Sequence, residues 1–207
     1  MFSCLLKMLN EEQKKKLLKI ARQTLETYII ERKIAKFNED DPELLKSYGA
    51  FVTLRKCTLN RVRSGSGPRS KSRDDGESLR GCIGHIISKE PLYKVVRDMA
   101  IASSTEDPRF PPVTANELKD IKIEISVLSK PNLIKDIEEF ELGTHGVIVR
   151  KGFNQGVFLP QVATETGWSK EEFLSNLCSH KAGLSSDAWK DKDTNIHIFD
   201  AQVFEEE

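Results

Sequence analysis

The clearest regular pattern along the chain is an alternation of apolar and polar residues between positions 121 and 127. Isoleucine or valine occupies every second position there, which predicts a strand with one buried face. Residues 17–29 instead carry apolar side chains three or four positions apart, the spacing of an amphipathic helix, and Asn10 with Gln13 resembles a capping pair at the helix start. The chain therefore contains both regular periodicities.

Further helices and strands follow from the same kind of evidence. Pro91 suits the first turn of a helix whose apolar residues form one narrow face, and capping pairs that begin at Thr114 and Ser169 predict two more helix starts. Apolar runs predict strands at residues 49–56, 79–87, 147–151, 156–159 and 195–204. Helices and strands interleave irregularly, which predicts an α+β fold with a mixed or antiparallel sheet and flanking helices.

The strands at 49–56 and 79–87 are expected to pair as a hairpin that carries a long insertion. Residues 58–78 are rich in serine, glycine and basic residues and almost without apolar ones, which predicts a flexible loop. Residues 55–73 contain basic residues and no acidic one, so any contact with nucleic acid is expected to be local to this run. The whole chain has 32 basic and 32 acidic residues, a balance that gives no general affinity for nucleic acid or anionic membranes.

The cysteines and the N-terminal residues exclude several classes of protein. The four cysteines are widely scattered and form no Cys-x-x-Cys pair, which argues against a zinc ribbon or a thioredoxin-type site, and we predict no metal site. The apolar patch at residues 2–6 is followed at once by charged residues, so it is too short for a signal peptide or a membrane span. The sequence predicts a reduced, cytoplasmic protein without a membrane partner.

Residues 79–84 read Leu-Arg-Gly-Cys-Ile-Gly and place a thiol beside a guanidinium and between two glycines. On a regular strand Arg80, Cys82 and Gly84 share one face, and Gly84 leaves an open slot beside the thiol. A bulge at the glycines would break this parity and re-aim the thiol. A nearby cation favours the thiolate, so Cys82 is a candidate nucleophile, and an inert core cysteine is the alternative.

This six-residue segment resembles the signature of the AMMECR family. Six further blocks match in the family's order, at residues 49–54, 107–110, 124–128, 143–146, 158–162 and 181–184. The resemblance covers residues 10–205 and implies a single AMMECR-type domain over residues 1–207, built from two subdomains with the signature at their interface. It also implies that the insertion at 58–78 replaces the short turn of other members.

Two residues are candidates for acid and base chemistry with Cys82. His145 lies in a turn just before an apolar strand and falls in one of the matching blocks, so its imidazole is a candidate general acid or base. Glu124 falls on the polar face of its strand and is a candidate to orient His145 or to pair with Arg80. The alternatives are a structural turn histidine and an exposed strand carboxylate.

Two arginines are candidate anion clamps, because a guanidinium matches a carboxylate or phosphate with two hydrogen bonds. One is Arg80, and the other is Arg109, for which a local ion pair with Asp107 is the alternative. The full set of residues predicted to bind a ligand is Arg80, Gly81, Gly84, Asp107, Arg109 and Phe110. We expect these residues and the catalytic candidates to meet in one cleft.

We predict an intracellular enzyme that uses a cleft around Cys82 for thiol-dependent group transfer or modification chemistry. A non-catalytic module that binds a nucleotide, RNA or peptide is an alternative, and so is a scaffold for other proteins. The chain has no dinucleotide, ATP, zinc-protease or serine-hydrolase motif, and its cofactor is unknown. In some genomes the family is encoded beside Memo-like and radical S-adenosylmethionine proteins, so the resemblance suggests these as partners.

Overall fold

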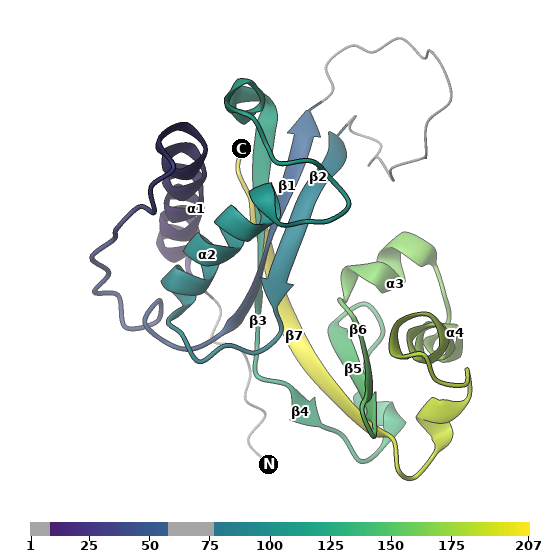
Figure 1. The fold of residues 1–207 in the computed structure, drawn as a ribbon. Coiled ribbons are helices and arrows are strands. Elements are labelled where there is room, and N and C mark those ends of the chain that lie inside the picture. Colours follow the sequence, from purple (N-terminus) through teal and green to yellow (C-terminus); the bar gives the residue numbers. More distant parts are fainter. Residues whose placement is uncertain (1–8, 58–76) are drawn as a thin grey trace, which may run out of the picture. The chain divides into compact units, whose positions relative to one another are not determined.

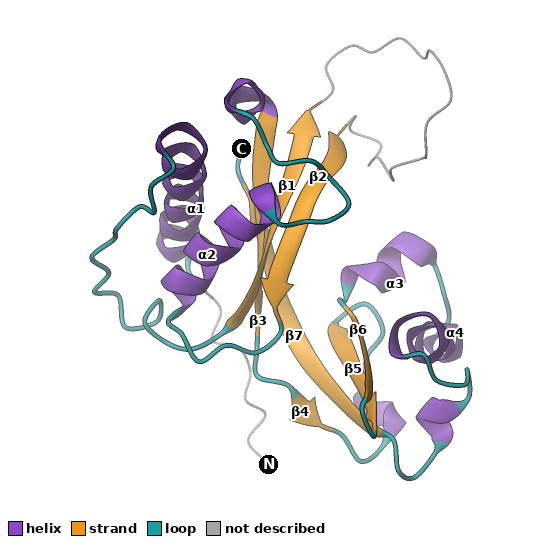
Figure 2. Cartoon of the chain, in the orientation of Figure 1, coloured by secondary structure: helices purple, strands orange, loops and turns teal. Residues whose placement is uncertain are grey.

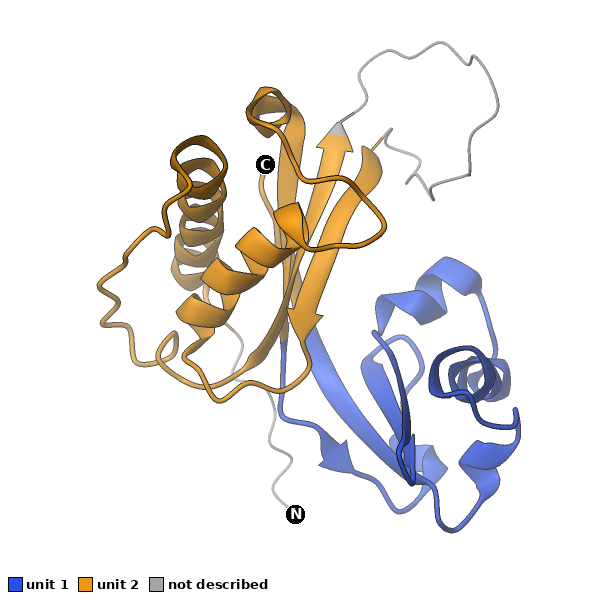
Figure 3. Ribbon diagram, viewed as in Figure 1, with its two compact units in different colours: residues 1–7, 128–201 blue, residues 8–127, 202–207 orange. Residues whose placement is uncertain are grey.

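The computed structural model describes residues 9–57 and 77–207 (Figure 1). The chain divides into two compact units (Figure 3). Unit 1 contains the described residues 128–201, and unit 2 contains residues 9–57, 77–127 and 202–207. Helices and antiparallel strand pairs occur in both units (Figure 2), so the fold is α+β, as the sequence predicts.

Unit 2 holds the longest helices and the Cys82 strand. Its elements are α1 (Glu11–Glu31), β1 (Gly49–Cys57), β2 (Glu77–His85), α2 (Leu92–Thr105), the 3-10 helix η1 (Ala115–Asp120), β3 (Ile121–Leu128) and the C-terminal end of β7 (Asn195–Glu205). The strands lie in the order β2-β1-β3-β7, so β2 is the last strand on its side of the described sheet. Helix α2 packs against α1 and against β1 and β2, and it covers one face of these two strands.

The capping pairs predicted from the sequence are confirmed. The Asn10 side chain accepts a hydrogen bond from the backbone N–H of Gln13 at 2.9 Å, and the Gln13 side chain accepts one from the backbone N–H of Asn10 at 3.0 Å. The same reciprocal arrangement begins η1 at Thr114 and α4 (Lys170–Asn176) at Ser169. Each pair satisfies backbone N–H groups that have no partner inside the helix.

Helix α2 buries more than the single narrow face that the sequence predicts. Pro91 is its N-cap residue, and every position from Met99 to Ser104 is buried. Two of these residues are alanine and two are serine, and their small side chains let the helix lie close to the sheet, where Val52 and Leu54 of β1 are fully buried. The helical period alone could not show this, because the small polar residues are buried by a close approach of backbones.

The pairing of β1 with β2 contains a bulge at Arg80. Leu54 faces Gly81, but Arg55 faces Leu79, so Arg80 is the extra residue on β2. The parity predicted for a regular strand therefore holds for Cys82 and Gly84 and is wrong for Arg80. The alternative prediction of a bulge is correct in part: a bulge is present next to Gly81, but it re-aims Arg80 and leaves the Cys82 thiol on its predicted face.

The two signature glycines are explained by contacts within unit 2. A Cβ atom on Gly81 would lie 2.1 Å from the carbonyl oxygen of Ser103 in α2, so only glycine allows the strand and helix to approach so closely. A Cβ atom on Gly84 would lie 2.3 Å from Cγ of Phe51 on the facing strand. The prediction of an open slot beside Gly84 is therefore wrong, because the Phe51 ring fills it.

Unit 1 is built from shorter elements around aromatic side chains. They are β4 (Asn132–Leu133), η2 (Ile137–Glu139), β5 (His145–Lys151), β6 (Asn154–Phe158), α3 (Gln161–Thr166), α4, the π-helix η3 (Leu177–Ala182), η4 (Ala188–Lys190) and the first part of β7. Strand β5 pairs antiparallel with both β6 and β7. The ring of Phe173 lies 5.5 Å from that of Phe140 and 5.1 Å from that of Phe158, centroid to centroid, and these rings form the centre of the core.

Two predictions about organisation have different outcomes. Glu77 and Ser78 belong to β2, where they pair with the end of β1, so the predicted insertion ends before them. The rest of that prediction, residues 58–76, lies outside the described residues. The placement of the signature at a subdomain interface stays a prediction.

A further result concerns membranes. Within residues 9–57 and 77–207, no helix combines the length and the apolar character that crossing a bilayer requires.

Candidate functional site

The Cys82 thiol lies on the face of unit 2 opposite to α2. Cys82 faces Thr53 of β1, and facing residues of an antiparallel pair project to the same side. The Thr53 hydroxyl donates a hydrogen bond to the Cys82 sulfur, with Oγ1 at 3.2 Å from Sγ. The neighbouring Gly81 lies against α2, so Cys82 points away from that helix. The Cys82 residue is partly buried.

Asp107 fixes the backbone at Cys82. Its Oδ2 accepts a hydrogen bond from the Cys82 backbone N–H at 2.8 Å. The Arg109 guanidinium donates to the same carboxylate from Nε at 2.9 Å and from Nη2 at 2.7 Å, and Nη2 also lies 3.4 Å from the Cys82 carbonyl oxygen. Because β2 is the last strand of the described sheet, this loop supplies the bonds that a further strand would otherwise make.

Arg109 is held at one end and exposed at the other. Its side chain is 54% exposed, whereas that of Asp107 is 2% exposed. No described residue hydrogen-bonds Nη1 of Arg109, and the guanidinium carbon lies 5.5 Å from the centre of the Phe110 ring. The ion pair with Asp107 offered as an alternative from the sequence is present, and it lowers the pKa of Asp107 to about 2. The pair therefore presents an oriented cation close to the thiol.

The expectation of a lowered Cys82 pKa is wrong. Burial raises the pKa of the thiol above its ordinary value, and the Thr53 hydrogen bond and the charge of Arg109 offset this only in part. The nearby carboxylates of Glu124 and Asp107 also raise it. Cys82 is accordingly a protonated thiol near neutral pH, so its reaction as a nucleophile requires removal of the S–H proton.

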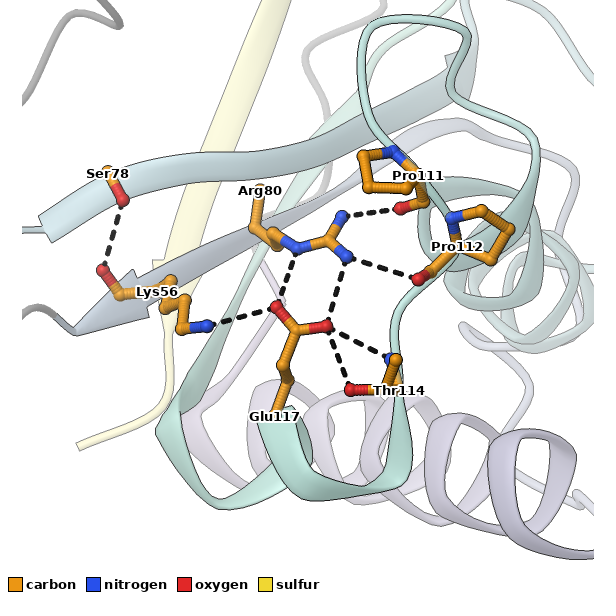
Figure 4. Close-up of polar contacts among 7 residues, drawn as sticks. All are labelled: Lys56, Ser78, Arg80, Pro111, Pro112, Thr114 and Glu117. Atoms are coloured by element: carbon orange, nitrogen blue, oxygen red, sulfur yellow. Dashed lines mark hydrogen bonds and ion pairs between the residues drawn. The ribbon is translucent and has the colours of Figure 1, made fainter. Parts of the chain in front are cut away.

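The Arg80 guanidinium donates hydrogen bonds to other segments of unit 2 (Figure 4). Its Nε and Nη2 donate to the two carboxylate oxygens of Glu117 at 3.0 and 3.1 Å. Nη1 and Nη2 also donate to the carbonyl oxygens of Pro111 and Pro112 at 2.9 and 3.2 Å. Its side chain is 10% exposed, and the bulge aims it at η1 and the proline loop. This arrangement supports a structural role for Arg80 rather than the anion clamp suggested by the sequence.

Glu117 collects hydrogen bonds from several segments in Figure 4. Besides Arg80, it accepts from Nζ of Lys56 at 3.0 Å and from the backbone N–H and hydroxyl of Thr114, each at 3.1 Å. The Arg80 hydrogen bonds, followed by those of Thr114 and Lys56, hold the pKa of Glu117 well below its ordinary range. The carboxylate thus ties β1 and β2 to the start of η1.

Glu124 is paired with Arg55 in the interior. Its Oε2 lies 3.5 Å from Nη2 of Arg55, at the outer limit of a hydrogen bond, and both side chains are nearly inaccessible, 4% and 11% exposed. Its partner Arg55 lies two residues after Thr53 on β1, so the pair belongs to the face of unit 2 that carries the Cys82 thiol. The sequence did not single out Thr53 or Arg55, because only the strand register shows that they share a face with Cys82.

His145 belongs to unit 1 and has local partners there. Its Nδ1 accepts a hydrogen bond from the backbone N–H of Glu141 at 3.0 Å, and its Nε2 lies 3.7 Å from Oδ1 of Asp200. The first bond assigns the proton of the neutral ring to Nε2, on the side of Asp200. A structural role accounts for both nitrogens, and the meeting of His145 with Cys82 in one cleft stays a prediction.

The described part of the chain contains no set of side chains arranged as metal ligands. No group of three or more His, Cys, Asp or Glu side chains there is arranged to hold an ion. The groups available around Cys82 in unit 2 are one thiol, one hydroxyl, two carboxylates and two guanidinium groups.

Comparison with known proteins places this geometry in a family. A family model described as AMMECR1 matches residues 18–204. The chain belongs to the AMMECR1 family. Over 197 residues it is 41% identical to a protein of Thermococcus gammatolerans, covering 92% of this chain and 89% of the relative. Protein PF1979 of Pyrococcus furiosus is 40% identical over the same length, covering 92% and 87%.

A solved structure extends the AMMECR1 comparison to the fold. Uncharacterized Protein PH0010 from Pyrococcus horikoshii superposes with a TM-score of 0.82 at 37% identity, covering 96% of this chain and 94% of that one. The AMMECR1 match includes the Cys82 strand, the loop that carries Asp107 and Arg109, and the Glu124 strand. The resemblance inferred from the signature is thus confirmed, and the chemistry has to be argued from the site itself.

Proposed function

We propose that unit 2 carries a thiol-dependent group-transfer site, in which Cys82 is the nucleophile and Arg109 holds an anionic part of the substrate. The observation that carries the proposal is the Asp107 carboxylate, which binds both the Cys82 backbone and the Arg109 guanidinium. One carboxylate thereby sets the position of the thiol strand relative to a cation that is half exposed. Such a fixed distance between a nucleophile and a charge is what substrate positioning requires.

The protonated state of the thiol gives Glu124 a role in this proposal. Attack by Cys82 requires a base for the S–H proton, and Glu124 is a carboxylate whose partner Arg55 projects from the same face of β1 as Thr53, which contacts the thiol. Burial keeps Glu124 away from bulk water, and its pairing with Arg55 fixes its position. We assign Glu124 the role of general base within unit 2.

A second candidate function is a non-catalytic site for an anionic ligand. The raised pKa of Cys82 supports it, because binding needs the Arg109 cation and does not need a thiolate. In this alternative Cys82 only lines the binding site. A bound anion would shield the thiol from alkylation and would not itself react.

Competition between two alkylating agents tests the proposed site. Iodoacetate and iodoacetamide react with thiols in the same way, but only iodoacetate is an anion. The measured preference is the ratio of the iodoacetate rate to the iodoacetamide rate. We expect this ratio to be higher for Cys82 than for the free thiol of N-acetylcysteine. Arg109→Gln should reduce the ratio about fivefold, equivalent to about 1 kcal/mol of screened charge interaction. Rates are measured by peptide mapping, with Cys82→Ser as the blank for the other cysteines.

A matched arginine controls for the loss of net charge. Arg97→Gln removes a guanidinium of α2 that pairs with its neighbour Asp98, and it should leave the preference for iodoacetate unchanged. Equal preference in the wild type and in Arg109→Gln would contradict the anion site. A Cys82 thiol that neither reagent modifies in the folded protein would contradict the nucleophile assignment and favour the binding alternative.

A further inference from the structure

We infer that Arg55 is the oxyanion donor of the Cys82 site, which identifies the substrate class as an acyl group carried on an anionic leaving group, such as an acyl phosphate. The inference rests on the proposed function, since it deepens the chemistry of the same thiol. It assigns the two arginines near Cys82 different parts of one substrate. Arg109 binds the anionic leaving group, and Arg55 binds the oxygen of the acyl carbonyl.

The first observation is an unsatisfied donor. Nε of Arg55 is fully buried and has no hydrogen-bond partner. Its Nη2 reaches Glu124 at 3.5 Å, the outer limit of a hydrogen bond. A buried N–H without an acceptor costs about 1–3 kcal/mol, and one on a charged group costs more, so such a group indicates an acceptor that arrives with a ligand.

The second observation is the position of Arg55 relative to the thiol. Arg55 follows Thr53 by two residues on β1, so both side chains project from the same face of the strand. Thr53 contacts the Cys82 sulfur on that face. Two residues of strand span about 7 Å, which an arginine side chain covers. The unsatisfied N–H therefore belongs to a side chain that projects on the same face of the sheet as the Cys82 sulfur.

The third observation is that Arg55 and Arg109, although each pairs with a carboxylate, keep one donor atom without an acceptor among the described residues. Arg80 donates hydrogen bonds to Glu117 and to two carbonyl groups. By contrast, Nη1 of Arg109 and Nε of Arg55 have no hydrogen-bond partner among the described residues. Arg109 is half exposed and suits a charged, hydrated leaving group, and Arg55 is buried and suits a neutral carbonyl that becomes an oxyanion.

The reaction balances with an acyl phosphate. The Cys82 S–H proton passes to Glu124, and the sulfur forms a bond to the carbonyl carbon while the carbonyl oxygen gains negative charge at Nε of Arg55. The bond from that carbon to the phosphate oxygen then breaks, and the phosphate leaves with the electron pair beside Arg109. The proton on Glu124 passes to the departing phosphate, and the products are an S-acyl cysteine and hydrogenphosphate.

Acetyl phosphate is the probe for the test. The wild-type chain is incubated with it, and S-acetylation of Cys82 is followed by intact mass and peptide mapping. We expect a rate above that of N-acetylcysteine at the same pH, and a loss of about 100-fold in Arg55→Gln, the usual effect of removing one oxyanion donor. Alkylation by iodoacetamide develops no oxyanion, so Arg55→Gln should slow it only through the loss of the contact that positions Glu124, and far less than it slows acetylation.

Each outcome points to one claim. Equal acetylation rates in the wild type and Arg55→Gln overturn the role of Arg55, and so does an equal fall in acetylation and alkylation, which would show an effect through the fold. Wild-type acetylation no faster than that of N-acetylcysteine overturns the substrate class, while the iodoacetate preference, measured separately, still decides the proposed function. Arg97→Gln is again the matched control, and it should retain the wild-type acetylation rate.

Discussion

Arg80 and Arg109 form similar ion pairs but differ in their remaining contacts and in their exposure. Each forms a two-point pair with one carboxylate, Glu117 for Arg80 and Asp107 for Arg109. Arg80 additionally donates to two backbone carbonyl groups and is 10% exposed, whereas Arg109 keeps one nitrogen without a described partner and is 54% exposed.

The comparison shows that the internal acceptors around an arginine decide its role. A guanidinium has five N–H donors, and one carboxylate satisfies only two of them well. Where backbone carbonyls take up further donors, as at Arg80, the group is a structural cross-link. Where they do not, as at Arg109, the same ion pair orients a guanidinium that keeps a donor available.

The largest expected effect is a difference in stability between matched substitutions of these arginines. Arg80→Gln should lower the free energy of unfolding by about 3 kcal/mol, because it breaks a buried pair and leaves carbonyl groups without donors. Arg109→Gln should cost about 1 kcal/mol, since solvent screens its exposed half. Urea unfolding followed by circular dichroism measures both, and equal losses would remove the distinction.

A second prediction concerns the acid side of the Asp107 pair. Its pKa falls from 3.8 to about 2 on folding, so its contribution to stability is complete above the ordinary value and is lost as the pH falls through this range. Asp107→Asn should therefore be less stable than the wild type by about 2 kcal/mol near neutral pH.

The pH dependence separates this charge effect from a packing effect. The unfolding free energies of the wild type and Asp107→Asn should converge as the pH falls from 3.8 toward 2, because the wild-type carboxylate is then protonated. A difference that stays constant down to the acid limit would mean that asparagine disturbs the loop for another reason.

The smallest expected effect tests the hydrogen bond on the thiol. The Thr53 hydroxyl lowers the pKa of Cys82 against the effect of burial, so Thr53→Val, which keeps the shape of the side chain, should raise that pKa further. The pH profile of iodoacetamide alkylation reports the change. A shift to lower pH would show that the hydroxyl accepts from the thiol instead of donating to it.

The parts of the fold that the sequence predicts well depend on neighbouring residues. The Asn10 and Thr114 capping pairs join positions three apart, and the β3 alternation depends on the local pleat, so short segments contain all the necessary information. The Asp107 pair with Arg109 is equally local, which is why the sequence offered it as one of two possibilities.

The missed features depend on contacts between distant segments. The bulge at Arg80 exists because the register with β1 shifts at Leu54, and the burial of Arg80 depends on the proline loop more than thirty residues later. Likewise, Thr53 becomes a neighbour of Cys82 only through strand pairing. Neither propensity nor periodicity encodes such pairings, so the thiol's surroundings could not be derived from residues 79–84 alone.

A strand at the end of a sheet normally presents a row of free N–H and C=O groups, which is a template for aggregation through the pairing of one molecule with the next. On β2 the row is interrupted at two places, by the irregular backbone at Arg80 and by the Asp107 and Arg109 side chains that take up the peptide groups of Cys82. The loop that carries Asp107 and Arg109 thus also reduces the number of free peptide groups that this edge offers to another strand.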